Sequence, residues 1–346
     1  MEKTTIEKYK DRGLTGLTNV GNTCYLNSCV QILSHTYELN EFLDEETYKT
    51  KLNKKPDSVL IIEWDKLRKL MWSQNCTIAP WGFVKAVQKI SGMKRISLFT
   101  GYSQNDIQEF LMFLIDSFHN SISREVDMTI SGTAKNDKDI LAKACYKMMS
   151  DMYKNDYSDI VKLFCGISVT EILSVTDGER LSVRPEPFFV LSLSMPTGNK
   201  KLTLLECIDA YCGKERMEGD NAWYNEKTDK KQDIDKGIVF WAFPEVLMVH
   251  FKRWDYRGRK DSRLVTCDFE NINLSKYVKG YNKMSNIFDL YGVCNHSGGA
   301  GGGHYTANVR VANGEWYNFN DTNVTKISDS QVLSPQAYCL FFRKKK

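Results

Sequence analysis

A cysteine follows a turn-forming stretch in residues 16–28, GLTNVGNTCYLNS. We expect the side-chain oxygen of Asn22 or Thr23 to cap a helix here, which places Cys24 in the first helical turn. The positive end of a helix dipole favours a thiolate over a thiol, so Cys24 is a candidate nucleophile. The alternative is a capped helix with a core cysteine, and this segment alone does not decide between the two.

A nucleophilic thiol needs a base, and the chain contains five histidines. His35 and His119 lie near the ends of predicted helices, and His250 lies inside an apolar strand, where a buried structural role is expected. His296 and His304 flank the segment SGGAGGG, which has more glycines than a simple turn needs. We expect a gate whose glycines let a substrate backbone pass close to His304, and a surface linker is the alternative.

A hairpin at Asn313-Gly314 decides which side chain orients His304. With a two-residue turn, Asp321 lies diagonally across from the histidine on the same face. With a three-residue turn and a bulge at Gly314, Asn320 takes that place. Either register predicts a Cys–His–Asn or Cys–His–Asp site assembled from opposite ends of the chain.

An oxyanion forms when a thiolate attacks a carbonyl group, and a fixed amide donor stabilises it by about 3–4 kcal/mol. Asn19 precedes the turn and can point its side-chain amide toward that position. A turn-forming asparagine beside Gly21 is the simpler interpretation of the spacing alone.

The elements that must position these residues change type along the chain. Apolar residues recur every three or four positions, as in amphipathic helices, over residues 24–35, 58–72 and 103–120. After about residue 165 the period becomes two, and strands are predicted over residues 188–195, 245–254, 286–296, 304–311 and 315–321. A polar excursion, 220–236, separates two of the strands. Helices followed by antiparallel strands predict an α+β fold with a cleft between two lobes.

The composition is that of a soluble globular protein, with 42% apolar and 26% charged residues among 346. A net charge of +4 without a basic stripe argues against a nucleic-acid partner. Residues 1–13 are charged, unlike a signal peptide, and no apolar run approaches the roughly 20 residues of a membrane helix. We therefore expect an intracellular protein without a membrane partner, whose ten cysteines remain free thiols.

Five segments resemble the sequence boxes of the ubiquitin-specific proteases, in the order found in that family: GLTNVGNTCYLNSCVQIL, YSQNDIQEFLMFLID, FPEVLMVHFKRW, GGGHYTANV and EWYNFNDTNV. The resemblance implies a papain-like cysteine protease fold with a helical thumb, an antiparallel β palm and β fingers. The catalytic domain would span 13–343, with the thumb roughly over 13–164 and the palm and fingers roughly over 165–343. An N-terminal segment, 1–12, and a basic tip, 344–346, would lie outside it.

The resemblance also implies a role for individual residues. Cys24 matches the nucleophile and His304 the general base. Asn320 matches the third triad position, which favours the bulged register. Asn19 matches the residue that stabilises the oxyanion, and Asp321 matches an adjacent polar position that assists in some members.

A second group of residues matches the family's site for the ubiquitin tail. Asp106 and Glu109 match acidic residues that help to hold this tail, which is basic. Asp106 also completes a predicted capping box with Ser103 at the start of a helix. A loop over a narrow channel, which admits a Gly-Gly sequence, is matched by Gly302, Gly303 and Tyr305.

The implied activity is that of a deubiquitinating thiol protease, which hydrolyses the isopeptide or peptide bond after the C-terminal glycine of ubiquitin. Three alternatives stay open: a non-catalytic ubiquitin-binding relative, a protease for another ubiquitin-like modifier, and a thiol acyltransferase with the same triad. The expected partners are ubiquitin and ubiquitinated proteins or ubiquitin chains. We expect a monomer in the cytoplasm, and also in the nucleus, that needs no cofactor.

The resemblance fails at one feature. Many family members bind zinc at the fingertips through two C-x-x-C pairs, and the matching positions here hold Ser174, Asp177, Asn225 and Thr228. Serine, asparagine and threonine are poor zinc ligands, and one aspartate does not replace four thiolates. We therefore expect no structural zinc.

Overall fold

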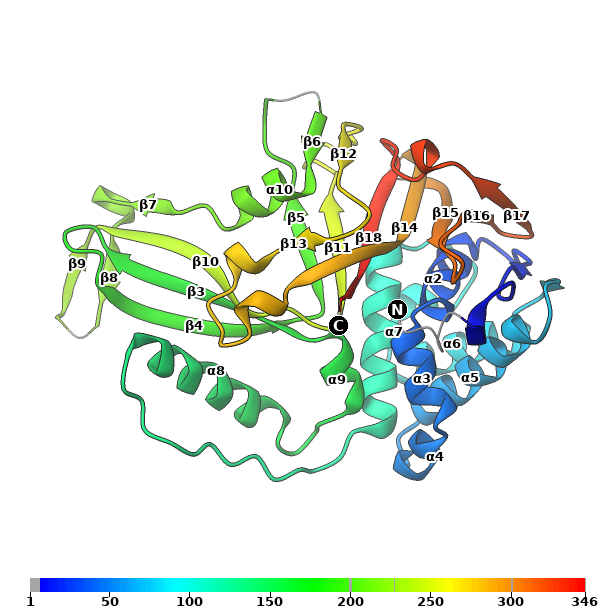
Figure 1. The fold of residues 1–346 in the computed structure, drawn as a ribbon, viewed down its shortest axis with the longest axis horizontal. Coiled ribbons are helices and arrows are strands. Elements are labelled where there is room, and N and C mark those ends of the chain that lie inside the picture. Colours follow the sequence, from blue (N-terminus) through cyan, green and yellow to red (C-terminus); the bar gives the residue numbers. More distant parts are fainter. Residues whose placement is uncertain (1–6, 199–200, 227, 300, 346) are drawn as a thin grey trace.

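The structure is a computed structural model that describes residues 7–198, 201–226, 228–299 and 301–345. The first six residues of the expected N-terminal segment, Ala300 of the glycine-rich segment and Lys346 of the basic tip lie outside the described residues. Most helices of the first half gather around α7, whereas β3, β4 and β10 extend away on the other side (Figure 1).

The helical half carries a buried apolar core between its helices. Trp64 is fully buried, and its ring lies 5.9 Å from the ring of Phe83 and 6.0 Å from that of Phe118. The helices predicted over 24–35 and 58–72 are confirmed. The helices are α2 (Cys24–Ser34), α3 (Tyr37–Asp44), α4 (Thr47–Lys51), α5 (Ser58–Ser73), α6 (Trp81–Met93), α7 (Ile107–Ile122), α8 (Asp137–Tyr153), α9 (Asp159–Phe164) and, among the strands, α10 (Leu204–Tyr211).

The predicted capping box at residue 103 is wrong, because α7 begins later. Asp106 is itself the N-cap residue, and its carboxylate accepts hydrogen bonds from the backbone N–H groups of Gln108, at 2.7 Å, and Glu109, at 3.3 Å. A carboxylate satisfies exposed N–H groups as well as a hydroxyl does and also suits the positive end of the helix dipole. Ser103 therefore lies in the loop before the helix.

An eight-stranded sheet forms the palm, in the order β17-β16-β15-β14-β18-β11-β5 with β13 beside β14. Its pairs are antiparallel except β5 with β11, which run parallel, so the expectation of a purely antiparallel palm needs this correction. A long excursion through the second sheet separates β5 from β11, and it gives the chain room for a parallel crossover. The strands are β5 (Val190–Ser194), β11 (Val246–Lys252), β13 (Ile272–Asn273), β14 (Ile287–Gly299), β15 (Gly302–Arg310), β16 (Trp316–Asn320), β17 (Asn323–Ile327) and β18 (Ala337–Lys344).

A second sheet, in the order β4-β3-β10-β7, extends away from the palm (Figure 1). Its strands are β3 (Gly166–Ser174), β4 (Arg180–Phe188), β7 (Glu215–Met217) and β10 (Ile234–Ala242). Three small pairs complete the strands: β1 (Gly16–Leu17) with β2 (Thr77–Ile78), β6 (Lys201–Thr203) with β12 (Leu264–Thr266), and β8 (Trp223–Asn225) with β9 (Lys230–Gln232). The polar excursion over 220–236 thus contains a hairpin, β8–β9, and the start of β10.

The four positions that match zinc ligands in the family lie at two turns. The Ser174 hydroxyl accepts a hydrogen bond from the N–H of Thr176, and the Asp177 carboxylate accepts one from the N–H of Glu179. Asn225 ends β8, and Thr228 follows it in the next turn. Within the described ranges, no group of three or more His, Cys, Asp or Glu side chains is placed to hold a metal ion. None of the described helices is both long enough and apolar enough to span a membrane.

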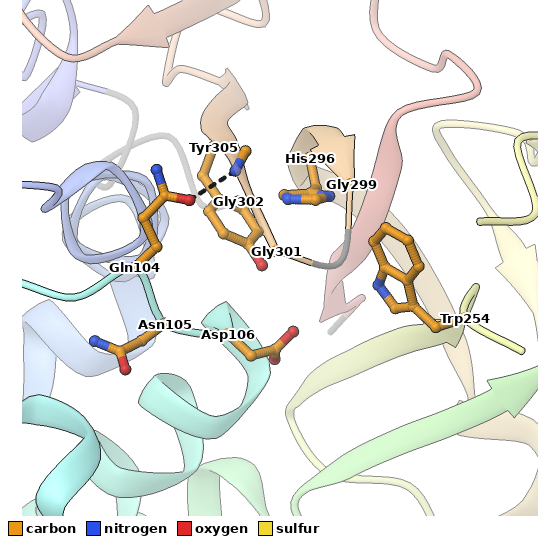
Figure 2. A pocket seen from close by; sticks show the side chains of 10 residues that line it. Gln104, Asn105, Asp106, Trp254, His296, Gly299, Gly301, Gly302 and Tyr305 are labelled. Atoms are coloured by element: carbon orange, nitrogen blue, oxygen red, sulfur yellow. Dashed lines mark hydrogen bonds between the residues drawn. The ribbon is translucent and has the colours of Figure 1, made fainter. Parts of the chain in front are cut away.

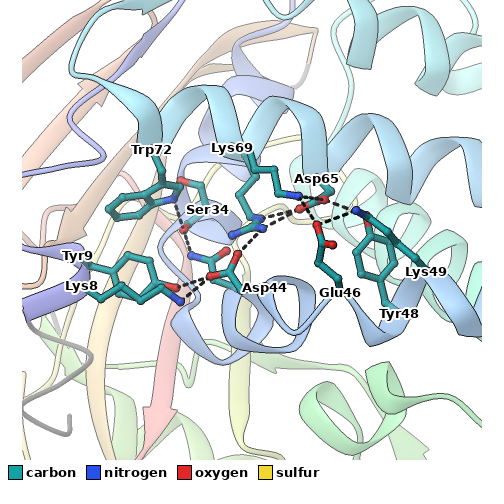
Figure 3. A network of polar contacts seen from close by, with 12 residues as sticks. Lys8, Tyr9, Ser34, Asp44, Glu46, Tyr48, Lys49, Asp65, Lys69 and Trp72 are labelled. Carbon is teal, nitrogen blue, oxygen red and sulfur yellow. Dashed lines mark hydrogen bonds and ion pairs between the residues drawn. The ribbon is translucent and has the colours of Figure 1, made fainter.

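A polar network that is buried around Arg68 and Asp65 joins α2, α3 and α5 in the thumb (Figure 3). Arg68 is 3% exposed and forms ion pairs with Asp65, at 2.6 Å, and with Asp44, at 2.7 Å. Burial alone would raise the pKa of the Asp65 carboxyl, but hydrogen bonds from Arg68, Lys69 and Tyr48 outweigh burial and lower it. The resulting stabilisation is present above the unfolded pKa of aspartate, about 3.9, and is lost as the pH falls through the lowered folded value.

Substitution of Arg68 tests this network. Arg68→Met leaves Asp65 buried without its main partner, and we expect a loss of about 3–5 kcal/mol in the free energy of unfolding. Denaturant unfolding followed by circular dichroism measures this loss. Lys66→Met on the same helix removes an exposed pair with Glu63 and should change stability by less than about 1 kcal/mol. Equal effects of the two substitutions would contradict the stabilising role of the buried pair.

Candidate active site

The loop before α2 is organised by one asparagine side chain. Asn19 Oδ1 accepts hydrogen bonds from the N–H groups of Gly21, at 3.3 Å, and Thr23, at 3.0 Å. Gly21 has a φ of +118°, and a Cβ at this position would lie 2.6 Å from the ring of Tyr102, so only glycine fits. The loop therefore bends sharply just before Cys24.

The expected side-chain cap on α2 is wrong. Thr23 occupies the N-cap position but makes no capping hydrogen bond, and its hydroxyl accepts from the N–H of Val20 instead, at 3.0 Å. Asn22 has a φ of +52° and donates its amide to the carbonyl of Tyr102, at 2.9 Å. Both side chains shape the loop rather than the helix end.

Cys24 begins α2, which packs against β15 of the palm sheet, and only 3% of its surface is exposed. Burial raises the pKa of its thiol, the Tyr305 backbone N–H directed at the thiol lowers it, and the nearby charge of Asp321 raises it further. The net effect is a raised pKa, which corrects the expectation of a thiolate stabilised by the helix dipole. Loss of water around the sulfur outweighs the favourable dipole.

The β15–β16 hairpin confirms the bulged register. Ala307 pairs with Phe319, and the N–H of Gly314 donates to the carbonyl of Val311, at 2.9 Å. Gly314 has a φ of +89°, which suits the last residue of a three-residue turn. Continued by one step, this register places Asn320 opposite Thr306.

The imidazole of His304 donates from Nε2 to Asn320 Oδ1, at 2.7 Å. An amide oxygen only accepts, so Nε2 carries the proton, and Nδ1 of the neutral ring carries the free lone pair. Nδ1 has no hydrogen-bond partner among the described residues, and His304 precedes Tyr305, whose N–H faces Cys24. The predicted base and the predicted orienting amide are therefore in contact, and the residue that follows the base in the sequence faces the Cys24 thiol.

The Asp321 side chain is hydrogen bonded to residues near the N-terminus and not to His304. Its Oδ2 accepts from Asn19 Nδ2, at 3.1 Å, and its Oδ1 accepts from Asn27 Nδ2, at 2.7 Å. Its backbone carbonyl accepts from the N–H of Leu17, at 2.8 Å. The sequence analysis did not identify Asn27, because a polar residue inside a helix gives no signal of a partner almost 300 positions later.

A cavity of about 300 Å³ lies between the start of α7 and the glycine-rich segment (Figure 2). Of the residues matched to the tail site, Asp106, Gly302, Gly303 and Tyr305 line it, whereas Glu109 does not. Gln104 also lines the cavity, and its Oε1 accepts a hydrogen bond from the N–H of Gly303, at 2.7 Å. The sequence analysis did not single out Gln104.

The glycine-rich segment is a β-hairpin rather than a surface linker in the described residues. Gly299 pairs with Gly302 and Gly298 with Gly303 at the ends of β14 and β15. A Cβ on Gly303 would lie 2.3 Å from the carbonyl oxygen of Ser297 and 2.4 Å from His296 Nε2. The two strands therefore approach each other at a distance that excludes a side chain.

Partly buried polar side chains form hydrogen bonds with Asp106 and His296, which line this cavity. Asp106 Oδ2 accepts from the hydroxyl of Tyr338, at 2.7 Å, in addition to capping α7. Lys260 Nζ lies 3.0 Å from His296 Nδ1 and also donates to the carbonyl of His296. Burial and the charge of Lys260 lower the pKa of His296 to about 4, so this ring is neutral at pH 7.

The remaining histidines are engaged elsewhere. Burial lowers the pKa of His35 and of His250 to about 4. His250 Nδ1 lies 3.3 Å from the hydroxyl of Ser192, in keeping with a buried structural residue. His119 Nδ1 lies 2.7 Å from the hydroxyl of Ser158.

Comparison with known proteins identifies relatives over nearly the whole chain. Residues 15–342 match the family model described as ubiquitin carboxyl-terminal hydrolase. Ubiquitin carboxyl-terminal hydrolase 2 of Bos taurus is 32% identical over 347 residues, which cover 98% of this chain and 56% of the relative. The Homo sapiens protein of that name is 32% identical over 340 residues, which cover 96% and 55%. The chain thus spans about half the length of these curated relatives.

The fold also matches a solved structure, a SAGA DUB module of Ubp8, Sgf11, Sus1 and Sgf73 bound to monoubiquitin. The matched chain gives a TM-score of 0.74 at 24% identity, with 96% of this chain and 70% of that chain covered. The expected α+β fold is confirmed.

The raised pKa of Cys24 predicts slow alkylation at neutral pH. We expect the rate of reaction with iodoacetamide to follow a thiol pKa above the ordinary value of about 8.5. Asp321→Asn removes a negative charge beside the sulfur, so the apparent pKa should fall and alkylation near pH 7 should accelerate. Mass spectrometry of the peptide that contains Cys24 measures the rate at each pH.

Glu315 provides the control, because its carboxylate lies on the same hairpin and pairs with Lys326. Glu315→Gln should leave the alkylation profile of Cys24 unchanged. If the alkylation rate of wild-type Cys24 rose with a midpoint below the ordinary thiol pKa of about 8.5, the raised pKa would be contradicted.

Two glycines of one hairpin should respond differently to substitution. Gly303→Ala places a methyl group against Ser297 and His296, and overpacking of this kind costs about 1–3 kcal/mol of unfolding free energy. Gly301→Ala meets nothing within 4 Å and should cost clearly less. Thermal unfolding of both variants checks the difference, and equal melting temperatures would show that the close approach does not constrain the hairpin.

Proposed function

The chain belongs to the ubiquitin carboxyl-terminal hydrolase family, and on that premise we propose that it is a deubiquitinating thiol protease. It hydrolyses the isopeptide or peptide bond after the C-terminal glycine of ubiquitin, with ubiquitinated proteins or ubiquitin chains as substrates. The hydrogen bond from His304 Nε2 to Asn320 carries the proposal, because it leaves Nδ1 as a base beside the residue whose N–H faces Cys24. The solved Ubp8 module bound to monoubiquitin supports the choice of substrate.

The first step is transfer of the Cys24 thiol proton to His304 Nδ1. Because burial raises the pKa of the thiol, we propose that this transfer accompanies attack by the sulfur. The sulfur forms a bond to the glycine carbonyl carbon, and the carbonyl electron pair moves to oxygen. Asn320 holds the imidazole in the tautomer that accepts this proton and stabilises the imidazolium that results.

The oxyanion accepts a hydrogen bond from Asn19. One hydrogen of the Asn19 amide is directed at Asp321, and the second is available to the developing negative charge. The tetrahedral intermediate then expels the lysine amine, which takes the proton from the imidazolium. A water molecule, deprotonated by the same imidazole, attacks the thioester and releases the ubiquitin carboxylate together with the thiol.

The cavity beside the glycine hairpin is the proposed path of the ubiquitin tail. Gly302 and Gly303 form one wall, and the absence of side chains suits a diglycine segment that passes close to the backbone. Both oxygens of Asp106 are already hydrogen bonded, so this residue shapes the path. Glu109, whose carboxylate has no hydrogen-bond or ion-pair partner among the described residues, supplies charge for basic tail residues farther out.

A ubiquitin reporter with a C-terminal leaving group tests the proposal. Wild-type chain should release the group, and Cys24→Ala should lose turnover while it still binds ubiquitin. Cys29→Ala, which alters a fully buried cysteine on the same helix, should retain most of the activity. Ubiquitin with an electrophilic C-terminus should label Cys24, as mapped by mass spectrometry.

Several outcomes would refute the proposal. Turnover by Cys24→Ala, or labelling of a different cysteine, would remove the assigned nucleophile. Binding of ubiquitin without any cleavage by the wild-type chain would indicate a binding module, and cleavage of only a different modifier would reassign the substrate.

A further inference from the structure

Asn27 connects α2 to the turn between β16 and β17, and we propose that it is a positioning residue for the oxyanion donor. This inference rests on the proposed thiol protease function. It concerns a side chain that touches neither substrate nor sulfur and acts through Asp321 on Asn19.

The contacts form a continuous chain of three side chains. Asn27 is 1% exposed, and its Nδ2 donates to Asp321 Oδ1, at 2.7 Å. The other oxygen of Asp321 accepts from Asn19 Nδ2, at 3.1 Å. Each oxygen of one carboxylate thus holds one amide, and hydrogen bonds to a charged acceptor are stronger than neutral ones.

The carboxylate needs the second contact to keep its orientation. Asp321 lies with a φ of +49° in the turn between β16 and β17, outside the pairing of these strands. With Asn27 removed, the side chain would be held by Asn19 alone and could rotate about its own bonds. Asn19 would then lose a fixed acceptor, and its free N–H would no longer point to one place.

The backbone around Asn27 reinforces the same link. Its Nδ2 also lies 3.3 Å from the carbonyl of Leu17 and 3.4 Å from that of Thr18, just before Asn19. One buried amide therefore contacts both the carboxylate and the chain segment that carries the oxyanion donor.

An asparagine at position 27 lowers the stability of the fold. Asparagine is a weak helix former, and Asn27 Oδ1 is buried with no hydrogen-bond partner in the described part of the chain. An apolar side chain would avoid the desolvation of this oxygen. The contact with Asp321 gives the costly residue a function.

Asn40 provides a matched control for substitution. It is fully buried, donates its Nδ2 to the carbonyl of Ser34, at 2.6 Å, and also has an unpartnered Oδ1. Asn27→Ala and Asn40→Ala should both lower the melting temperature. Only Asn27→Ala should lower kcat on the ubiquitin reporter, by about 10-fold to 100-fold, with KM within about twofold, because an oxyanion donor acts mainly in the transition state.

The outcomes separate this inference from the function on which it rests. Equal kcat values for N27A and N40A, or a change in KM alone, would each overturn the role of Asn27. A wild-type chain that neither cleaves the reporter nor is labelled at Cys24 would overturn the proposed function and this inference together.

Discussion

The left-handed backbone at Asp321 sends two neighbouring side chains to two different partners. Asn320 reaches across the hairpin to His304, whereas Asp321 turns to Asn19 and Asn27. In a continuing strand these neighbours would point to opposite faces of the sheet, and only one face meets the start of α2. The φ of +49° at the strand end lets both side chains serve the same site. The orientations of the His304 and Asn19 side chains thus both depend on one short segment.

The same segment brings a C-terminal part of the chain into contact with an N-terminal part. The N–H of Leu17 donates to the carbonyl of Asp321, and a Cβ on Gly16 would lie 2.4 Å from the carbonyl oxygen of Thr322. The two regions are about 300 positions apart in sequence, so their approach is produced by the packing of α2 on the palm sheet.

The sequence predicted the parts of the site that depend on residue type and local spacing. Periodicity located α2 and α5, and the turn at Gly314 limited the orienting residue to two candidates. The choice between them depended on how many residues enter the turn, which the pairing of β15 with β16 decides. The cap on α2 was predicted wrongly because the Thr23 hydroxyl accepts from the N–H of Val20 and the Asn22 amide donates to the carbonyl of Tyr102. The thiol pKa was predicted wrongly because a helix dipole is local, whereas burial depends on the whole fold. Asn27 and Gln104 were missed because their partners lie far away in the chain.

The glycine-rich hairpin beside the cavity is held in place from both sides. Gln104 accepts from the backbone of Gly303 on the thumb side, and Lys260 holds the backbone of His296 on the other. Between them the strands lie so close that a methyl group on Gly303 would overlap His296. A wall built from backbone cannot move aside as a flexible side chain can, because the hydrogen bonds between β14 and β15 would have to break. The wall that Gly302 and Gly303 give to the cavity is therefore a property of the backbone and not of side chains.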